Sequence, residues 1–161
     1  MPLINFSWVI PGKLAGTSMP GGYSGGTQSL QDDIGQLAAA GIRRLLSLEL
    51  PDQSLSLLCK NAGMQWEYFH IPDFGIPENV DAFDGVINSV QQSIEQGDAV
   101  CVHCRAGIGR TGMVLTCIVG KLYMLGYDKA VDTVRRTRKA LETPEQETFT
   151  KQYLSDYEQR I

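Results

Sequence analysis

The sequence predicts a single α/β domain, spanning residues 1–161, in which a central, mostly parallel, twisted sheet is flanked by helices. Short apolar segments that fit strands alternate along the chain with longer segments of helical periodicity. This alternation is typical of a parallel sheet covered on both sides. A chain of 161 residues with 43% hydrophobic residues also suits one domain with a sizeable core, and we find no repeat or linker that would divide it.

The predicted strands are short and are bounded by turn residues. In chain order they cover residues 1–10, 13–16, 42–48, 64–71 and 99–103. Trp66, Tyr68 and His70 alternate along their strand, so we expect them on one face. Segment 99–103 is apolar enough to be buried on both faces, which predicts the central strand.

The predicted helices carry apolar residues at helical spacing and begin at capping residues. The first runs from Ser29 to Gly41, and the second runs from a cap at Asp52 to about Gly63. The third opens at Pro77-Glu78 and ends before Gly97. The glycine-rich stretch 16–26 predicts a mobile loop, either a simple connector or a flap near a binding pocket.

Three more helices follow the central strand. The helix over 110–125 is apolar nearly all round, so it should be buried, and it should end at Gly126. Asp128 is expected to cap the next helix, which extends to about Leu141. The last helix should have Thr143 as its N-cap, proline at N1 and Gln146 at N3.

Composition excludes several classes of function. The net charge of −4 argues against nucleic acid as a partner, and there is no apolar run long enough to cross a membrane. The 4 cysteines, Cys59, Cys101, Cys104 and Cys117, do not suggest a disulfide scaffold in a chain of this length. We therefore expect a monomer in a reducing cytoplasm.

Residues 100–112 carry the strongest chemical signal. A buried strand ends at Cys104, two glycines follow, and a helix opens at Arg110-Thr111. Gly107 and Gly109 allow the backbone to curl so that successive N–H groups point inward at a helix N-terminus, an arrangement that binds phosphate. Arg110 can add a bidentate fork, and the same positive field favours a thiolate at Cys104.

The run His103-Cys104-x5-Arg110-Thr111 resembles the signature of the cysteine-dependent protein tyrosine phosphatases. Other segments are similar to the small VHZ-like atypical dual-specificity phosphatases: Asn5-Phe6-Ser7-Trp8-Val9, Pro11-Gly12-Lys13-Leu14-Ala15-Gly16, Ile71-Pro72-Asp73-Phe74 and Glu142-Thr143-Pro144-Glu145-Gln146-Glu147. The resemblance covers nearly the whole chain. It implies a phosphatase that acts on phosphotyrosine, and on phosphoserine and phosphothreonine, in protein or peptide substrates.

The resemblance also implies roles for individual residues. Cys104 would be the nucleophile, and Asp73 would be the general acid, with Phe74 packing the loop around it. The thiolate would be steadied by Thr111 through its hydroxyl and by His103 through loop backbone. Gln146 would either orient the attacking water or serve only in the helix cap. The substrate phosphate would be bound by the loop residues Arg105, Ala106, Gly107, Ile108, Gly109 and Arg110.

Several alternatives stay open at this stage. A phosphoinositide phosphatase would usually carry lysines inside the loop, where this chain has Arg105 and Ile108. A phosphate-binding module without turnover, or a rhodanese-type sulfur transferase, would also use such a loop. The residues do not suggest a metal site, and we expect no cofactor.

Other charged and thiol groups are weaker candidates. Glu49 is interpreted as a solvated charge. The basic run Arg135, Arg136, Arg138 and Lys139 is interpreted as a solvated helix face or, less favoured, as a docking surface for an acidic substrate segment. Cys59 and Cys101 are possible resolving thiols for an oxidised Cys104.

Overall fold

The structure, a computed structural model, describes residues 2–22, 29–50 and 52–160, with side chains up to residue 156. The described strands form a 5-stranded sheet in the order β1-β2-β5-β3-β4. Strand β1 pairs with β2 antiparallel, and the remaining pairs are parallel, which confirms the predicted sheet. The strands are β1 Ser7–Ile10, β2 Leu14–Thr17, β3 Ile42–Ser47, β4 Gln65–Tyr68 and β5 Ala99–His103.

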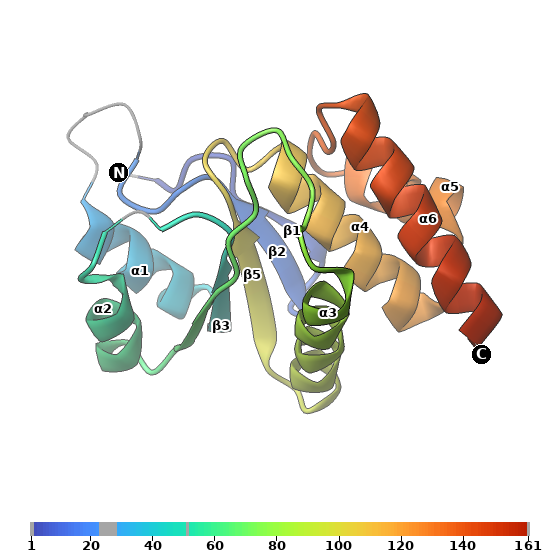
Figure 1. Cartoon of the computed structure of the whole chain (residues 1–161). Coiled ribbons are helices and arrows are strands. Elements are labelled where there is room, and N and C mark those ends of the chain that lie inside the picture. The colour runs from blue at the N-terminus through green and yellow to red at the C-terminus, as the bar shows by residue number, and fades with distance from the viewer. Residues whose placement is uncertain (1, 23–28, 51, 161) are drawn as a thin grey trace.

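Helices cover both faces of this sheet. Helices α1 and α2 lie on one side, and α3, α4, α5 and α6 lie on the other (Figure 1). Their bounds are α1 Leu30–Ala39, α2 Leu55–Asn61, α3 Val80–Glu95, α4 Gly109–Tyr123, α5 Tyr127–Arg135 and α6 Pro144–Arg160.

The core is divided by the sheet, and β5 contributes to both halves. Val100 and Val102 pack with α3 and α4 residues, while Ala99 and Cys101 belong to the cluster under α1 and α2. Every residue of β5 is buried, as predicted for the central strand. Helix α4 is buried along nearly its whole length, which also confirms its apolar pattern.

Several element ends differ from the sequence prediction. The N-terminal strand is confined to Ser7–Ile10. Helix α3 begins at Val80 rather than Pro77, because the Asn79 side chain accepts a hydrogen bond from the Ala82 N–H and so caps the helix. Ser54, not Asp52, stands at the N-cap of α2, and the Asp52 carboxylate accepts from Ser54 instead.

Around α4 and α5 the differences are larger. Helix α4 ends at Tyr123 rather than at Leu125, and its C-cap residue Met124 adopts the left-handed conformation. Gly126 is the N-cap of α5, so Asp128 lies inside the first turn. Helix α5 stops at Arg135, well before Leu141, and Arg138 of the segment that follows contacts Ser7 of β1.

The glycine-rich stretch 16–26 is described only in part. Gly16 and Thr17 belong to β2, and the buried residues Ser18 and Met19 follow directly. Residues 23–28 lie outside the described residues, so the predicted loop stays a prediction there.

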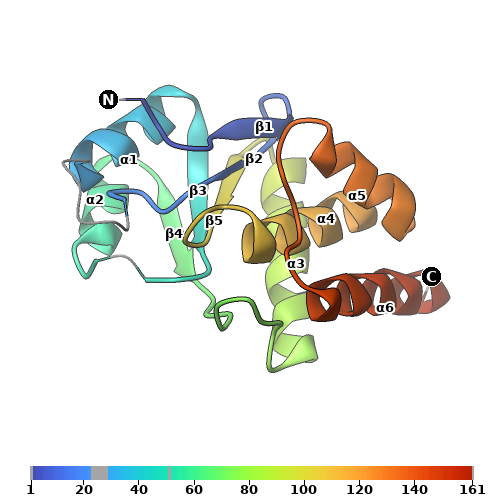
Figure 2. The same cartoon turned by 90° about the horizontal axis from the view of Figure 1, so that it is seen from above.

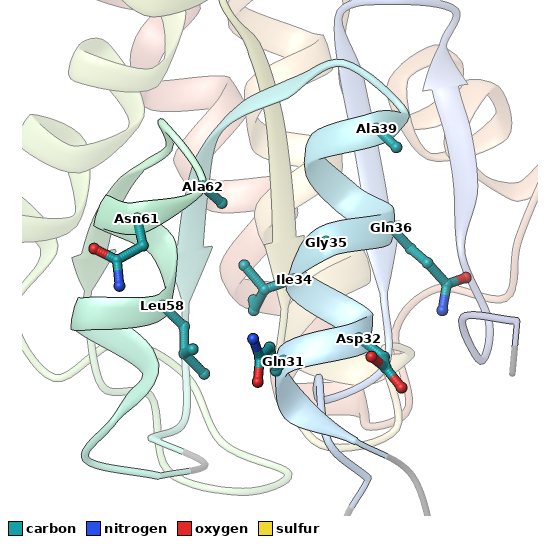
Figure 3. Close-up of a pocket in the computed structure, with 9 residues that line it drawn as sticks. All are labelled: Gln31, Asp32, Ile34, Gly35, Gln36, Ala39, Leu58, Asn61 and Ala62. Carbon is teal, nitrogen blue, oxygen red and sulfur yellow. The ribbon is translucent and has the colours of Figure 1, made fainter.

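A hollow of about 600 Å³ opens between α1 and α2. Ile34 of α1 and Leu58 of α2 stand in the groove between the two helices (Figure 3). None of the candidate site residues lines it, so the predicted chemistry lies elsewhere. No helix in the described part of the chain is long and apolar enough to cross a membrane.

Candidate active site

The candidate residues gather at the carboxyl ends of the parallel strands, where such sheets usually place their sites. The segment 104–108 connects β5 to α4, and the segment after β4 carries Asp73. In Figure 1 these segments and the one between α5 and α6 lie together at the upper end of the sheet, which faces the viewer in Figure 2. Hydrogen bonds link them: the Leu141 N–H donates to the Ile108 carbonyl, and Thr143 Oγ1 donates to the Phe74 carbonyl.

Each carbonyl group of the Cys104–Ile108 segment accepts a hydrogen bond from a group that lies outside the segment. The donors are His103 Nδ1 to Cys104 at 2.9 Å, Met19 N to Arg105 at 2.9 Å, Asn5 Nδ2 to Ala106 at 3.0 Å, Arg138 Nη2 to Gly107 at 2.7 Å, and Leu141 N to Ile108 at 3.2 Å. In a trans peptide the next N–H points away from the carbonyl, and the described peptides are all trans. The N–H groups of residues 105–109 therefore point away from these outer donors, an orientation that suits an anion cradle.

Gly107 is required by this geometry. Its φ is +78°, and a Cβ at this position would lie 2.6 Å from the Thr17 carbonyl oxygen. Gly109 is less confined: a Cβ there would lie 2.5 Å from Glu142 Oε1, the end of an exposed side chain that can move, and 3.0 Å from Gln146 Oε1. A side chain at Gly107 would therefore push the loop away from the backbone of Thr17.

Arg110 is almost fully buried, with its guanidinium held by three neighbours. It is 2% exposed, and Nη1 donates to the Ile71 carbonyl at 2.9 Å. Nη2 donates to Glu49 Oε1 at 2.9 Å and to Asp73 Oδ1 at 3.0 Å. The interpretation of Glu49 as a solvated charge is therefore wrong: it orients the guanidinium of the loop arginine.

Asp73 lies in a tight turn beside Arg110. The turn is closed by the Gly75 N–H, which donates to the Pro72 carbonyl at 2.8 Å. The Asp73 side chain is 45% exposed, so it can reach a bound ligand. Phe74 has a φ of 59° and is 57% exposed, which contradicts our expectation that it packs the loop.

Gln146 connects this turn to α6. It is fully buried, its Oε1 accepts from the Glu142 N–H at 2.8 Å, and its Nε2 donates to the Gly75 carbonyl at 3.3 Å. Thr143 Oγ1 accepts from the Gln146 N–H, as expected of the N-cap. Gln146 thus braces the turn that carries Asp73, and it lies beside Gly109 at the start of α4.

His103 is buried and neutral at physiological pH. Burial lowers the pKa of its imidazole to about 4. Because Nδ1 donates to the Cys104 carbonyl, Nε2 carries the lone pair and accepts from Ser47 Oγ at 2.6 Å. Trp66 Nε1 donates to the same hydroxyl at 2.8 Å. His103 therefore holds loop backbone, as expected, and adds no charge to the site.

Cys104 lies at the end of β5, is 3% exposed and is a free thiol. Thr111 is fully buried, and its hydroxyl has no hydrogen-bond partner among the described residues. The expected bond from Thr111 to the Cys104 sulfur is therefore not formed in this structure. The hydroxyl keeps a free donor directly after Arg110.

The basic run is only partly a solvated surface. Arg136 is exposed, but Arg138 is 6% exposed and donates to Ser7 Oγ at 2.9 Å as well as to the Gly107 carbonyl. The interpretation of Arg138 as part of a solvated helix face is wrong, because it supports the phosphate loop from inside the protein.

The other cysteines are poorly suited to react with Cys104. Cys59 and Cys101 lie in the core cluster under α1 and α2, whereas Cys104 belongs to the cluster on the other face. Burial raises the pKa of the Cys59 thiol to about 11 and that of Cys101 to about 12, and it raises the pKa of Cys117 as well. Among the described residues, no group of three or more His, Cys, Asp or Glu side chains could hold a metal ion.

Comparisons with known proteins agree with this geometry. A family model described as "Polymorphic toxin system, DSP-PTPase phosphatase" matches residues 15–121. Dual specificity protein phosphatase 12 of Mus musculus is 29% identical over 122 residues, which make up 74% of this chain and 34% of the mouse protein. The first curated relatives are matched over 58%, 9% and 34% of their own lengths, so the chain spans less than two thirds of each.

Solved structures of low sequence identity share the fold. The crystal structure of Tk-PTP in the active form superposes with a TM-score of 0.78 at 24% identity, covering 98% of both chains. PTPMT1 in complex with PI(5)P superposes with a TM-score of 0.77 at 14% identity, covering 97% of this chain and 98% of that one. Because the family model matches more than half of the chain, the protein belongs to the DSP-PTPase phosphatases, within the cysteine-dependent protein tyrosine phosphatase superfamily.

Proposed function

We propose that this protein hydrolyses phosphotyrosine, and phosphoserine or phosphothreonine, in protein substrates through a cysteinyl-phosphate intermediate on Cys104. The observation that carries the proposal is that each carbonyl of the Cys104–Ile108 loop is bound by a group outside the loop. We infer from it that the N–H groups of the loop are directed inward, beside Cys104. A nucleophile, an anion cradle, a buried guanidinium and an accessible carboxyl then share one site. Membership of the family supports the same reading.

In the first step the Cys104 thiolate attacks phosphorus. The S–P bond forms, the bond from phosphorus to the leaving oxygen breaks, and Asp73 gives its proton to that oxygen. The three other phosphate oxygens carry the charge of the transition state, so the fixed N–H groups and Arg110 stabilise it.

The contact between Arg110 and Asp73 has a role before this step. Nη2 of Arg110 is shared between the carboxylates of Glu49 and Asp73. A phosphate dianion in the loop competes for the same guanidinium, which releases the Asp73 carboxyl toward the leaving oxygen. Glu49 keeps the guanidinium oriented during the exchange.

In the second step a water molecule attacks the thiophosphate. The new O–P bond forms, the S–P bond breaks, and the Asp73 carboxylate takes the proton from the water. The free hydroxyl of Thr111 is available to donate to the sulfur as it leaves as a thiolate. Gln146, which braces the turn that carries Asp73, is a candidate for orienting the water.

A phosphoinositide is the second candidate substrate. It is favoured by the fold shared with PTPMT1, which was crystallised with PI(5)P. The loop interior argues for the protein substrate, because Arg105 and Ile108 stand where a phosphoinositide phosphatase would usually carry lysines.

A kinetic panel tests the proposal. Phosphotyrosine and phosphothreonine peptides and a phosphoinositide in vesicles are compared in the presence of a chelator, with Cys104→Ser as the inactive variant. We expect turnover of the peptides without metal, and orthophosphate binding without turnover in Cys104→Ser. Turnover of the phosphoinositide alone would replace the protein substrate by the lipid. Phosphate binding without turnover in the unmodified protein would indicate a binding module.

A further inference from the structure

Asn5 lies just before β1 and contacts the phosphate loop, although the two are 101 positions apart in the sequence. Its side-chain Nδ2 donates to the Ala106 carbonyl at 3.0 Å and approaches the Gly107 carbonyl at 3.4 Å. We propose that Asn5 is a positioning residue that fixes the outer side of the loop, so that the N-terminal arm is part of the anion-binding machinery. The proposal rests on the proposed function, because it concerns the same site.

The arm is anchored so that the Asn5 amide must point at the loop. The carbonyl of the preceding residue, Ile4, accepts from the Ser18 N–H at 3.1 Å, from Ser18 Oγ at 2.8 Å and from Thr17 Oγ1 at 3.2 Å. Thr17 and Ser18 are buried, and Thr17 is the residue against which Gly107 packs. The arm, the end of β2 and the phosphate loop thus form one contact.

The backbone conformation of Asn5 is also unusual. Its φ is 53°, in the left-handed region that most side chains avoid and that asparagine tolerates better than most. A rare backbone conformation that persists beside a binding site, with its side chain aimed at that site, is a reason to suspect a functional constraint. Here the conformation brings the amide from an exposed arm onto the loop carbonyls.

The hydrogen bond from Asn5 fixes the direction of one N–H donor of the cradle, that of Gly107. Among the bonds of the described residues, the Ala106 carbonyl is held by Asn5 alone, whereas Gly107 also has Arg138. Fixing the Ala106 carbonyl fixes the plane of the Ala106–Gly107 peptide, and therefore the direction of the Gly107 N–H. Without Asn5 this peptide can rotate, and one N–H of the cradle loses its orientation.

Two variants of Asn5 distinguish a role in orienting the loop for phosphate binding from a role in stability alone. Asn5→Gly keeps the left-handed conformation and removes the amide, while Asn5→Asp keeps the shape and replaces the donor by an acceptor. Asn61→Asp, on the exposed end of α2, is the control for added charge. The readouts are the dissociation constant of orthophosphate by calorimetry, kcat/KM for an aryl phosphate, and the unfolding midpoint.

We expect Asn5→Gly to weaken orthophosphate binding and to lower kcat/KM by about 2- to 12-fold, the scale of one hydrogen bond, with an unchanged unfolding midpoint. Asn5→Asp should lose at least as much, and Asn61→Asp should match the wild type. Unchanged phosphate affinity in both folded Asn5 variants, or a lower unfolding midpoint without an effect on affinity, would overturn the proposal.

The phosphate measurement does not need turnover. A wild type that binds orthophosphate but hydrolyses nothing would contradict the proposed function, while the effect of Asn5 on affinity would still decide the present proposal. A wild type that binds no orthophosphate would overturn both.

Discussion

Replacing Arg110 by lysine keeps a positive charge and removes the planar fork. The guanidinium is 2% exposed and uses separate nitrogens for the Ile71 carbonyl and for the carboxylates of Glu49 and Asp73. A single ammonium nitrogen cannot keep the Ile71 contact and also present two parallel donors to a phosphate. We expect Arg110→Lys to lose about 3 kcal/mol of transition-state stabilisation, on the scale of one preorganised donor.

The assay is kcat/KM for an aryl phosphate, where this loss corresponds to a decrease of about 10²- to 10³-fold. Arg136→Lys is the matched control, because Arg136 is 71% exposed and pairs only with Asp132 at 3.3 Å on the same helix among the described residues. The control should stay within about twofold of wild type, since exposed ion pairs contribute little. If folded Arg110→Lys also stayed within about threefold, the fork would not act in the transition state.

Three further predictions concern the acid, the histidine and the loop glycine. Asp73→Asn should lower kcat/KM for phosphotyrosine by roughly 10²- to 10⁴-fold and kcat/KM for a very acidic aryl leaving group much less. The basic limb of its pH profile of kcat/KM should flatten, and equal losses of kcat/KM on every leaving group would exclude Asp73 as the acid. The folded-state pKa of His103, about 4, lies below the ordinary 6.5. Its contribution to stability is therefore present above pH 6.5 and is lost as the pH falls toward 4. Urea titrations should show about 2 kcal/mol less unfolding free energy at pH 5 than at pH 7, and this difference should be smaller in His103→Gln. An equal difference between the two pH values in both proteins would contradict the prediction. Gly107→Ala should lower both the unfolding free energy, by about 1–2 kcal/mol or more, and phosphate affinity, because of the positive φ of 78° and the contact at 2.6 Å with Thr17; an unchanged unfolding curve would show that the loop relaxes freely.

The phosphate loop was predictable because its determinants are local. The strand before Cys104, the glycine at 107 and the helix that starts beside Arg110 follow one another within a few residues, and the structure forms them in that order. Parallel pairing then brings the turn of Asp73 to the same end of the sheet, so its contact with Arg110 follows from topology.

The supports of the loop could not be predicted, because they depend on contacts distant in sequence. Glu49 meets Arg110 across 61 positions and Arg138 meets Gly107 across 31, and neither residue carries a local sign of burial. A charged residue in a polar segment is usually solvated, which is why both were misinterpreted. The early end of α5 has a related cause, because the chain beyond Arg135 must turn for Arg138 to reach the loop.

Trapping the phosphoenzyme tests the central claim most directly. The Asp73→Asn variant is mixed with an activated aryl phosphate. Transfer of its phosphoryl group to Cys104 needs no acid, but hydrolysis of the thiophosphate still lacks its base, so the cysteinyl-phosphate intermediate should accumulate. After an acid quench, peptide mass spectrometry should find one phosphoryl group on the peptide with Cys104, and none in the Asp73→Asn protein that also carries Cys104→Ser. Continued turnover with a phosphoryl group on another residue, or with no covalent phosphate at any time point, would contradict the account.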